Sequence, residues 1–192
     1  LEIKPCDFVV PDQVIDRTRQ RPLTFFDDLA VHLPFADPFC PQLSRLYVES
    51  ATKAGVTIHE GGTYVCIEGP AFSTKAESRL YRSWEADIIG MTCLPEARLA
   101  REAEMCYATL AASTDYDVWH EEPVTTEIVL ANFARNLDNI RKIVREAISK
   151  VSDETECCCQ QALRGTLITA SSAVTDSDRE RYGLLLGRYL KA

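Results

Sequence analysis

The sequence is short of the features that mark several large classes of protein. Lysine and arginine number 21 against 29 aspartates and glutamates, which leaves a formal net charge of -8. No basic excess is available to release counterions from phosphates, so binding to nucleic acid or to an anionic membrane surface is not expected. No apolar run approaches the roughly 20 residues that span a bilayer, and the start shows no signal-peptide pattern. These absences predict a soluble cytoplasmic protein.

Short motifs with a known mechanism are also missing. The chain contains no GxGxxG, P-loop, HExxH or nucleophile-elbow pattern. Glycine and proline are few, with 8 and 9 residues of 192, whereas apolar residues make up 46%. This composition predicts one globular domain over residues 1–192 with one sizeable hydrophobic core.

Cysteine is the residue type whose number stands out, since the chain has eight. The run Cys157-Cys158-Cys159 could form a disulfide or supply thiolates to a metal. No second cluster or nearby histidine completes a zinc ligand set in the sequence, so a thiol or disulfide role is favoured and no metal site is predicted. The other five lie singly in apolar settings, where a reduced cysteine behaves as a small hydrophobe: Cys6, Cys40, Cys66, Cys93 and Cys106.

The middle of the chain alternates between strand and helix patterns, as in an α/β sheet. The stretches "ADIIGMT" and "CYATLAAST" are typical of buried strands, and "PEARLAREAE" between them is typical of a helix. Upstream, "DFVV" predicts a short strand and "VTIHEGGTYVCIEGP" predicts a hairpin at Gly61-Gly62. A long amphipathic helix is predicted from Thr125 to Val151, and a capped terminal helix from Ser177 or Asp178.

Three of the predicted strands end in groups that could bind a ligand. Ligands of open α/β sheets lie beyond the carboxyl ends of the strands, and these ends read "IEGPAFST", "IIGMT" and "LAASTDYD". They would bring together an aromatic face, a glycine that permits close backbone approach, two hydroxyls and two carboxylates. The candidate residues are Phe72, Ser73, Met91, Thr92, Asp115 and Asp117.

Each of these residues also has a purely structural interpretation. An aspartate pair after a strand is typical of a turn or a helix cap. Ser73 and Thr74 are placed to cap a helix, with Glu77 as the partner in a capping box. Phe72 and Met91 are equally typical of a core. The pattern alone therefore leaves the catalytic interpretation and the structural one open.

A long stretch of the chain, read as a whole, resembles the trimeric purine nucleoside phosphorylase family, and within it the methylthioadenosine phosphorylases. The stretch is "IEGPAFSTKAESRLYRSWEADIIGMTCLPEARLAREAEMCYATLAASTDYDVW". The resemblance extends upstream through "DFVVPDQVIDRTRQRPLTFFD" and "HLPFADPFCP" and downstream into the long helix, so it covers about residues 1–151.

The resemblance implies a three-layer α/β/α fold around a mixed, barrel-like sheet flanked by helices. It also implies a homo-oligomer, a trimer or hexamer, with active sites near the subunit interfaces. These enzymes split the N-glycosidic bond of a nucleoside with inorganic phosphate as co-substrate, and no cofactor is expected. Because the purine leaves as a poor anion, protonation at its N7 stabilises the transition state selectively. Two carboxyl groups close together can hold one proton between them for this purpose.

By the same resemblance, Asp115 would face N7 of the purine, and Asp117 would accept from the 6-amino group or support its neighbour. Members that act on 6-oxopurines typically carry Asn and then Lys after this strand. The sequence "TDYD" therefore resembles the pattern of members that bind adenine, a 6-aminopurine. The implied substrate contacts are Phe72 and Ser73 at the base, Met91 beneath the ribose, Thr92 at phosphate or a ribose hydroxyl, His32 reaching the 5′ end across the subunit boundary, and Thr126 and Val129 in the 5′ pocket.

The chain also departs from the family pattern. Ala71 replaces a larger polar or basic residue, and Glu85 replaces a glycine. The family's N-terminal third, which carries a glycine-rich phosphate loop and a phosphate-binding arginine, is missing, so we expect a domain that is incomplete at its N-terminus and needs that segment for activity. The predicted function is phosphorolysis of 5′-methylthioadenosine to adenine and 5-methylthioribose 1-phosphate. The alternatives are a broad purine nucleoside phosphorylase taking adenosine, inosine or guanosine, and a non-catalytic nucleoside-binding subunit.

Overall fold

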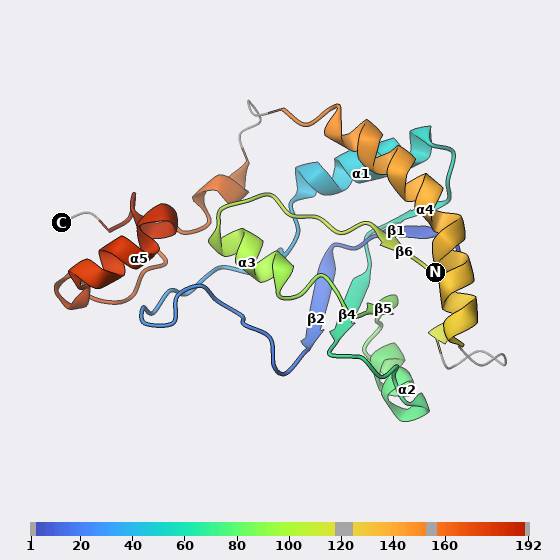
Figure 1. The fold of residues 1–192 in the computed structure, drawn as a ribbon, viewed down its shortest axis with the longest axis horizontal. Helices are drawn as coiled ribbons and strands as arrows, with labels where there is room; N and C mark the ends of the chain where they lie inside the picture. The colour runs from blue at the N-terminus through green and yellow to red at the C-terminus, as the bar shows by residue number, and fades with distance from the viewer. Residues whose placement is uncertain (1–2, 118–124, 153–156, 191–192) are drawn as a thin grey trace.

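The computed structural model describes residues 3–117, 125–152 and 157–190, and it has an elongated shape (Figure 1). Helix α5, Asp176–Leu186, lies at one end of the molecule, and helix α4, Thr126–Ile148, lies at the other (Figure 1). Two three-stranded sheets lie between them. Within the described ranges, no helix has the length and apolar character needed to cross a membrane.

The first sheet is mixed and has a fully buried strand at its centre. Strand β1, Phe8–Val10, pairs in parallel with β3, Ile58–Glu60, and antiparallel with β6, Ala111–Ala112. The predicted strand "DFVV" is thereby confirmed, and its three apolar residues are at most 2% exposed. A strand that is buried on both faces reads as a continuous apolar run, which is why this short segment was recognisable.

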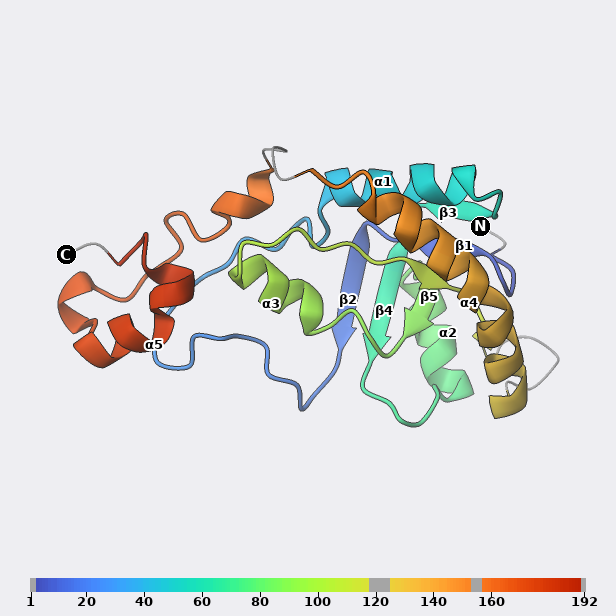
Figure 2. The ribbon, with the colours of Figure 1, turned by 45° about the horizontal axis from the view of Figure 1, so that its top comes forward.

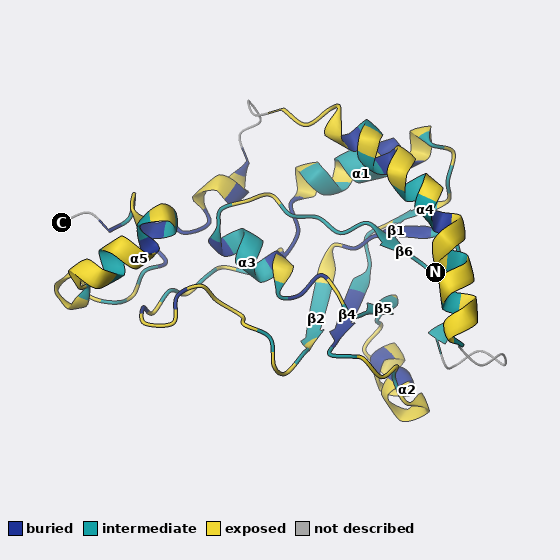
Figure 3. Cartoon of the chain, in the orientation of Figure 1, coloured by how far each residue is buried: buried dark blue, intermediate teal, exposed yellow. Residues whose placement is uncertain are grey.

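Two helices cover this first sheet. Helix α1, Pro41–Lys53, begins with proline at its first position, where no backbone N–H is required. It packs beside α4, and Figure 2 shows the two helices lying together over the strands. Phe8, Ala51 and Ile143 form the fully buried centre of this layer. The predicted amphipathic helix is confirmed in its C-terminal half, where Ile143 and Ala147 are buried and the opposite face is exposed (Figure 3). In its N-terminal half the apolar residues Leu130 and Phe133 are 61% and 50% exposed.

The second sheet is entirely parallel. Its strands are β2, Gln13–Arg17; β4, Thr63–Ile67; and β5, Ile88–Gly90, with β4 in the middle. Parallel strands need crossover connections, and helix α2, Lys75–Ser83, supplies the one between β4 and β5. Its N-cap Thr74 and Glu77 form the capping box that the sequence predicts.

Strand β4 sends alternate side chains to two different helices. Tyr64 and Cys66 pack with Leu94 on the side of helix α3, Glu96–Glu102. Val65 and Ile67 pack with Tyr81 of α2 on the other side. Because neighbouring side chains in a strand point to opposite faces, this alternation places helices on both sides of the sheet. The predicted α/β fold with three layers is confirmed.

The C-terminal part of the chain has a small core of its own. Two short 3-10 helices, η2 at Cys158–Gln161 and η3 at Ser171–Ala173, precede α5. Glu104, at the end of α3, ties this part to the rest by accepting from the Leu163 backbone N–H at 3.0 Å and from the Tyr189 hydroxyl at 2.6 Å. The buried cluster comprises Phe26, Leu29, Leu163, Tyr182, Leu186 and Leu190.

Three local predictions were wrong. The hairpin at Gly61-Gly62 does not form, because β3 and β4 belong to different sheets. Both glycines have positive φ angles, 84° and 110°, and turn the chain from one sheet into the other, a conformation that favours glycine over any side chain. The strand in "CYATLAAST" is only two residues long. Helix α5 begins at Asp176, ahead of Ser177, because Thr175 is its N-cap.

Candidate active site at the ends of two edge strands

A cleft of about 1030 Å³ opens between the edge strand of each sheet, β5 on one side and β6 on the other. Its size suits a small-molecule ligand such as a nucleoside. Residues 88–92 form one wall and residues 109–117 form the other. Four of the predicted site residues therefore meet in this cleft: Met91, Thr92, Asp115 and Asp117.

The wall that carries the two aspartates is held by helix α4. Asn132 donates from its side-chain amide to the Thr114 carbonyl at 2.6 Å. Asn136, which is 1% exposed, donates in the same way to the Ser113 carbonyl at 3.1 Å. Ser113 is also joined through its backbone to Cys6 and Asp7, so the chain is fixed on both sides just before Asp115. The two asparagines lie one helical turn apart on α4. Together they fix the backbone from which the two aspartates project into the cleft.

The carboxylates of Asp115 and Asp117 have different partners. Asp115 accepts from the Thr114 hydroxyl at 2.7 Å and from the Asp117 backbone N–H at 2.9 Å, which is an Asx turn. Asp117 has a positive φ of 58° and accepts a hydrogen bond from the hydroxyl of Ser78 on α2. The turn that the spacing allows is therefore present. It leaves both acids half-buried on the cleft wall.

The wall formed by residues 88–92 packs closely because of two glycines, Gly69 and Gly90. Gly69 has a φ of 70°, and a Cβ there would lie 2.6 Å from the sulfur of Met91. A Cβ on Gly90 would lie 2.0 Å from the hydroxyl oxygen of Tyr64, which is far inside contact distance. The absence of side chains at these positions lets Met91 and Tyr64 pack under the cleft.

Thr92 is held in position by Tyr64 and Cys66 of strand β4. The Tyr64 hydroxyl lies 3.4 Å from the Thr92 hydroxyl, and burial raises the pKa of Tyr64 to about 12. This tyrosine therefore remains protonated at neutral pH and keeps a proton to donate. Cys66 donates from its thiol to the Thr92 carbonyl at 2.6 Å.

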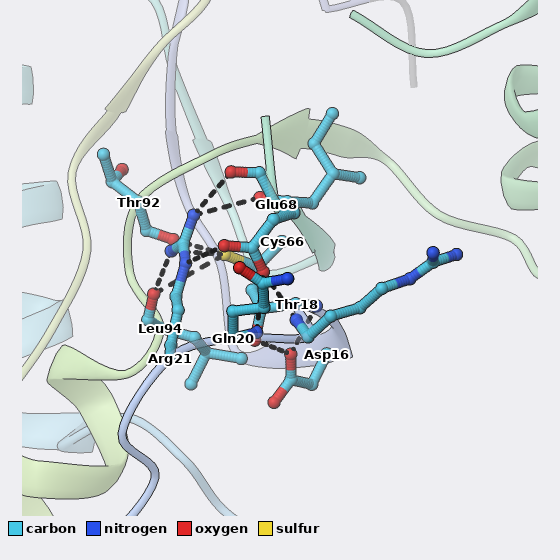
Figure 4. Close-up of polar contacts among 10 residues, drawn as sticks. Asp16, Thr18, Gln20, Arg21, Cys66, Glu68, Thr92 and Leu94 are labelled. Carbon is cyan, nitrogen blue, oxygen red and sulfur yellow. Dashed lines mark hydrogen bonds and ion pairs between the residues drawn. The ribbon is translucent and has the colours of Figure 1, made fainter. Parts of the chain in front are cut away.

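Arg21 fixes the loop after Thr92 from the other side (Figure 4). Its guanidinium donates to the carbonyls of Ile67, Glu68 and Leu94 and lies 3.5 Å from the Glu68 carboxylate. One side chain thus joins the end of β4 to the loop that follows β5. Planar guanidinium groups with several donors are suited to such a junction.

Five predicted site residues do not line this cleft. His32 is exposed and lines a separate cavity of about 390 Å³. Phe72 is 50% exposed, beside Ser73 in the loop that precedes α2. Thr126 and Val129 lie in the first turns of α4, whereas Phe133 is the residue of that helix's N-terminal half that reaches the cleft. The structure does not bring these five residues to the two aspartates within this single chain.

Several residues of the site were missed by reasoning from the sequence. Ser78 looked like an ordinary helix residue, and Asn132 and Asn136 were hidden among the polar residues of α4. Phe133 has the helical spacing of an apolar residue in an amphipathic helix, which is typical of a core position. A buried polar position inside an amphipathic helix, as at Asn136, is the signal that could have drawn attention to this face.

The fold and the cleft define an α/β protein that can hold a small polar ligand between two acids and a hydroxyl- and thioether-lined wall. The family model of the phosphorylase superfamily matches residues 1–149. The chain therefore belongs to the phosphorylase superfamily.

Two curated relatives carry the name S-methyl-5′-thioadenosine phosphorylase. The protein from Koribacter versatilis is 47% identical over 191 residues, which cover 98% of this chain and 65% of the relative. The protein from Thermosynechococcus vestitus is 49% identical over 195 residues, which cover 98% of this chain and 68% of the relative. The chain thus spans about two thirds of the length of the curated relatives that it matches.

Solved structures agree with this assignment. A methylthioadenosine phosphorylase sourced from an antarctic soil metagenomic library superimposes with a TM-score of 0.88 at 43% identity, covering 95% of this chain and 66% of that one. A mutant of the adenosine/methylthioadenosine phosphorylase from Schistosoma mansoni in complex with adenine gives a TM-score of 0.74 at 33% identity, with coverages of 77% and 60%. The mixed, phosphorylase-like α/β fold predicted from the sequence is confirmed.

Proposed function

We propose that the protein that contains this chain is a pentosyltransferase that splits 5′-methylthioadenosine with inorganic phosphate, giving adenine and 5-methylthioribose 1-phosphate. The observation that carries the proposal is the sequence identity of 47–49% to S-methyl-5′-thioadenosine phosphorylases across almost the whole chain. The cleft adds chemical support, because Asp115 and Asp117 stand on one wall, opposite Met91 and Thr92.

The acids supply the chemistry that the leaving purine needs. In our proposal the carboxyl group of Asp115 donates to N7 of adenine, and Asp117 accepts from the 6-amino group. The contact with Ser78 holds Asp117 in place, so the second acid is oriented before the ligand arrives. Orientation of this kind lowers the entropic cost of reaching the transition state. Thr92, supported by Tyr64 and Cys66, is assigned to a ribose hydroxyl or to phosphate.

The phosphate half of the site needs further groups. Among the described residues that line the cleft, the basic ones are Lys4 and Arg82. We propose that the remaining third of the relatives' length supplies the other phosphate ligands. Residues 1–192 alone are then expected to release no adenine. Phosphate-dependent release by this chain in isolation would show that part of the proposal to be wrong.

The position of His32 favours an oligomer. Its side chain is exposed and lines a cavity separate from the cleft, so a role at the ligand requires a neighbouring subunit. We propose a homotrimer in which His32 contacts the 5′ end of a ligand bound in the neighbouring subunit. Phe72 and Ser73 would contact the purine base. Thr126 and Val129 would shape the 5′ pocket with Phe133. We also propose a cytoplasmic location, with which the eight free cysteines are consistent. A role in methionine salvage follows from the proposed substrate.

Adenosine is the second candidate substrate, since one structural neighbour is named an adenosine/methylthioadenosine phosphorylase. The test compares phosphorolysis of methylthioadenosine, adenosine and inosine by the protein carrying this chain at the relatives' full length. Replacing Asp115 by Asn should lower kcat/KM for 6-aminopurine nucleosides by about 10² to 10⁴. The exposed Asp138→Asn on α4 serves as the control. Unchanged turnover in Asp115→Asn would remove that residue from the mechanism, and ligand binding without turnover would indicate a binding subunit.

A further inference from the structure

Four cysteines from three separate parts of the chain meet at one point. Cys40 is the N-cap of α1, Cys106 lies in the connection between α3 and β6, and Cys157 and Cys159 flank the start of η2. Their four sulfur atoms all lie within 4.8 Å of one another. The sulfurs of Cys40 and Cys157 are 3.5 Å apart. The prediction that no second cluster joins the Cys157–Cys159 run is wrong in three dimensions.

The spacing fits metal coordination better than disulfide bonding. A disulfide requires sulfurs about 2.05 Å apart, and all eight cysteines are free. Four thiolates around Zn²⁺ at about 2.3 Å form a tetrahedron whose edges are about 3.8 Å long. The Cys40 and Cys157 sulfurs, 3.5 Å apart, are close to that edge length, and all four sulfurs lie within 4.8 Å of one another. We propose that Cys40, Cys106, Cys157 and Cys159 form a structural Zn²⁺ site.

The backbone around Cys40 stabilises a negative charge on one of the four sulfurs. Cys40 stands at the N-terminus of a 13-residue helix, where the backbone N–H groups and the helix dipole stabilise a negative charge. Burial raises the pKa of Cys159, and the positive charge of Arg101 opposes that shift. Arg101 also donates to the Asp37 carbonyl in the approach to Cys40. On binding, the four thiols release their protons to solvent, and no electron transfer is involved. The resulting complex has two net negative charges, which the helix and Arg101 offset in part.

The site is closed in the way that a structural metal site requires. All four positions of the tetrahedron come from protein, so none remains for water or substrate. Cys40 and Cys159 are each 1% exposed and Cys157 is 9% exposed, whereas Cys106 is exposed and provides the side from which a metal can enter. The cysteines do not line the cleft that carries Asp115 and Asp117. This inference is therefore independent of the proposed reaction.

The metal would act as a clamp between the body of the protein and its C-terminal part. The backbone N–H of Cys40 donates to the Tyr107 carbonyl at 2.7 Å, so two of the contributing segments already lie side by side. The third segment follows α4 and leads through η2 into the core around α5. A tetrathiolate centre would fix the start of η2 against α1, where the packed apolar partner is Leu43.

The run itself offers a matched control, because Cys158 lies between two proposed ligands, is exposed and is not part of the cluster. The protein is purified under reducing conditions without chelator, and its metals are measured by inorganic mass spectrometry. We expect about one zinc ion per chain in the wild type and in Cys158→Ser. Cys159→Ser and Cys106→Ser should lose the zinc. Iron in place of zinc would show that the ligand set is right and the metal wrong, since thiolates also bind iron.

A second measurement does not depend on any variant folding correctly. Wild-type protein is stripped of metal, reduced and titrated with Co²⁺, which gives intense visible bands when four thiolates surround it tetrahedrally. These bands should appear, reach a maximum at one ion per chain and disappear on addition of Zn²⁺. Protein that carries no metal, shows no such bands after reduction, and yields peptides with disulfides joining these four cysteines would overturn the proposal. Loss of zinc from Cys158→Ser to the same extent as from Cys159→Ser would overturn it too.

Discussion

The hydroxyl of Ser78 on α2 donates a hydrogen bond to the carboxylate of Asp117, 39 positions further along the chain. Ser78 is 1% exposed, so this contact is shielded from water. The backbone of Asp117 has a φ of 58°, a left-handed conformation in which aspartate is enriched among the non-glycine residues. The helix that crosses between β4 and β5 thus orients an acid on the opposite wall of the cleft.

Replacing Ser78 by Ala should lower turnover more than stability. The unfolding free energy should fall by about 1 kcal/mol, the usual net value of one hydrogen bond. The value of kcat/KM for a 6-aminopurine nucleoside should fall about ten- to a hundredfold, because Asp117 is no longer held in its reactive orientation. Ser83→Ala, at the exposed end of the same helix, is the matched control. Equal effects of the two substitutions on kcat/KM would contradict the positioning role.

Replacing Gly90 by Ala should damage the wall that carries Met91 and Thr92. The added methyl would lie 2.0 Å from the Tyr64 hydroxyl oxygen, and a buried ring at 4% exposure has little room to move. We expect a loss of about 1 to 3 kcal/mol in unfolding free energy, measured by urea denaturation. In the double variant with Tyr64→Phe, part of that loss should be recovered, since the clashing oxygen is gone. Strictly additive effects would show that the two residues are not in contact.

Replacing Glu85 by Gly should stabilise the protein. Glu85 follows the last residue of α2 and its C-cap Trp84, and its φ of 59° is the left-handed conformation in which helices commonly end on glycine. Removing the Cβ from that conformation should raise the unfolding free energy by about 1 kcal/mol, although glycine adds entropy to the unfolded chain. Glu85→Ala keeps the Cβ and should leave stability close to that of the wild type. Destabilisation by glycine would show that the carboxylate contributes more than the strain costs.

The capping box of α2 should make stability depend on pH in the acid range. The Thr74 backbone N–H and then its hydroxyl lower the pKa of Glu77 from its ordinary value of 4.5. A carboxyl with a lowered folded-state pKa contributes its stability above pH 4.5 and loses it as the pH falls through the lowered value. Glu77→Gln should therefore flatten the acid limb of a plot of unfolding free energy against pH. The same substitution made in Thr74→Ala should flatten the limb somewhat less, because the hydroxyl donor is gone while the backbone N–H remains. An acid limb that Glu77→Gln leaves unchanged in the wild-type background would contradict the prediction.

Local patterns were enough to predict most of the elements. The run "DFVV", the amphipathic pattern in the C-terminal half of α4 and the Thr74–Glu77 capping box each depend on neighbours in sequence, and each was confirmed. The turn at Asp115 was also foreseeable from its spacing. The hairpin at Gly61-Gly62 failed because two β-rich runs beside glycines do not reveal which strand each will pair with. Pairing is decided by contacts with β1 and β2, which lie about 50 positions earlier in the chain.

By itself, the sequence determined the chemistry that this protein can offer: acids after one predicted strand, a thioether and a hydroxyl after another, and cysteines in a reduced, apolar setting. Only the tertiary structure decided which of these groups meet. It joined Asp117 to Ser78, gathered Cys106 and Cys40 around the Cys157–Cys159 run, and left His32 away from the cleft. The physical reason is that spacing along a helix or strand constrains near neighbours, whereas contacts between distant residues depend on how sheets and helices pack as a whole.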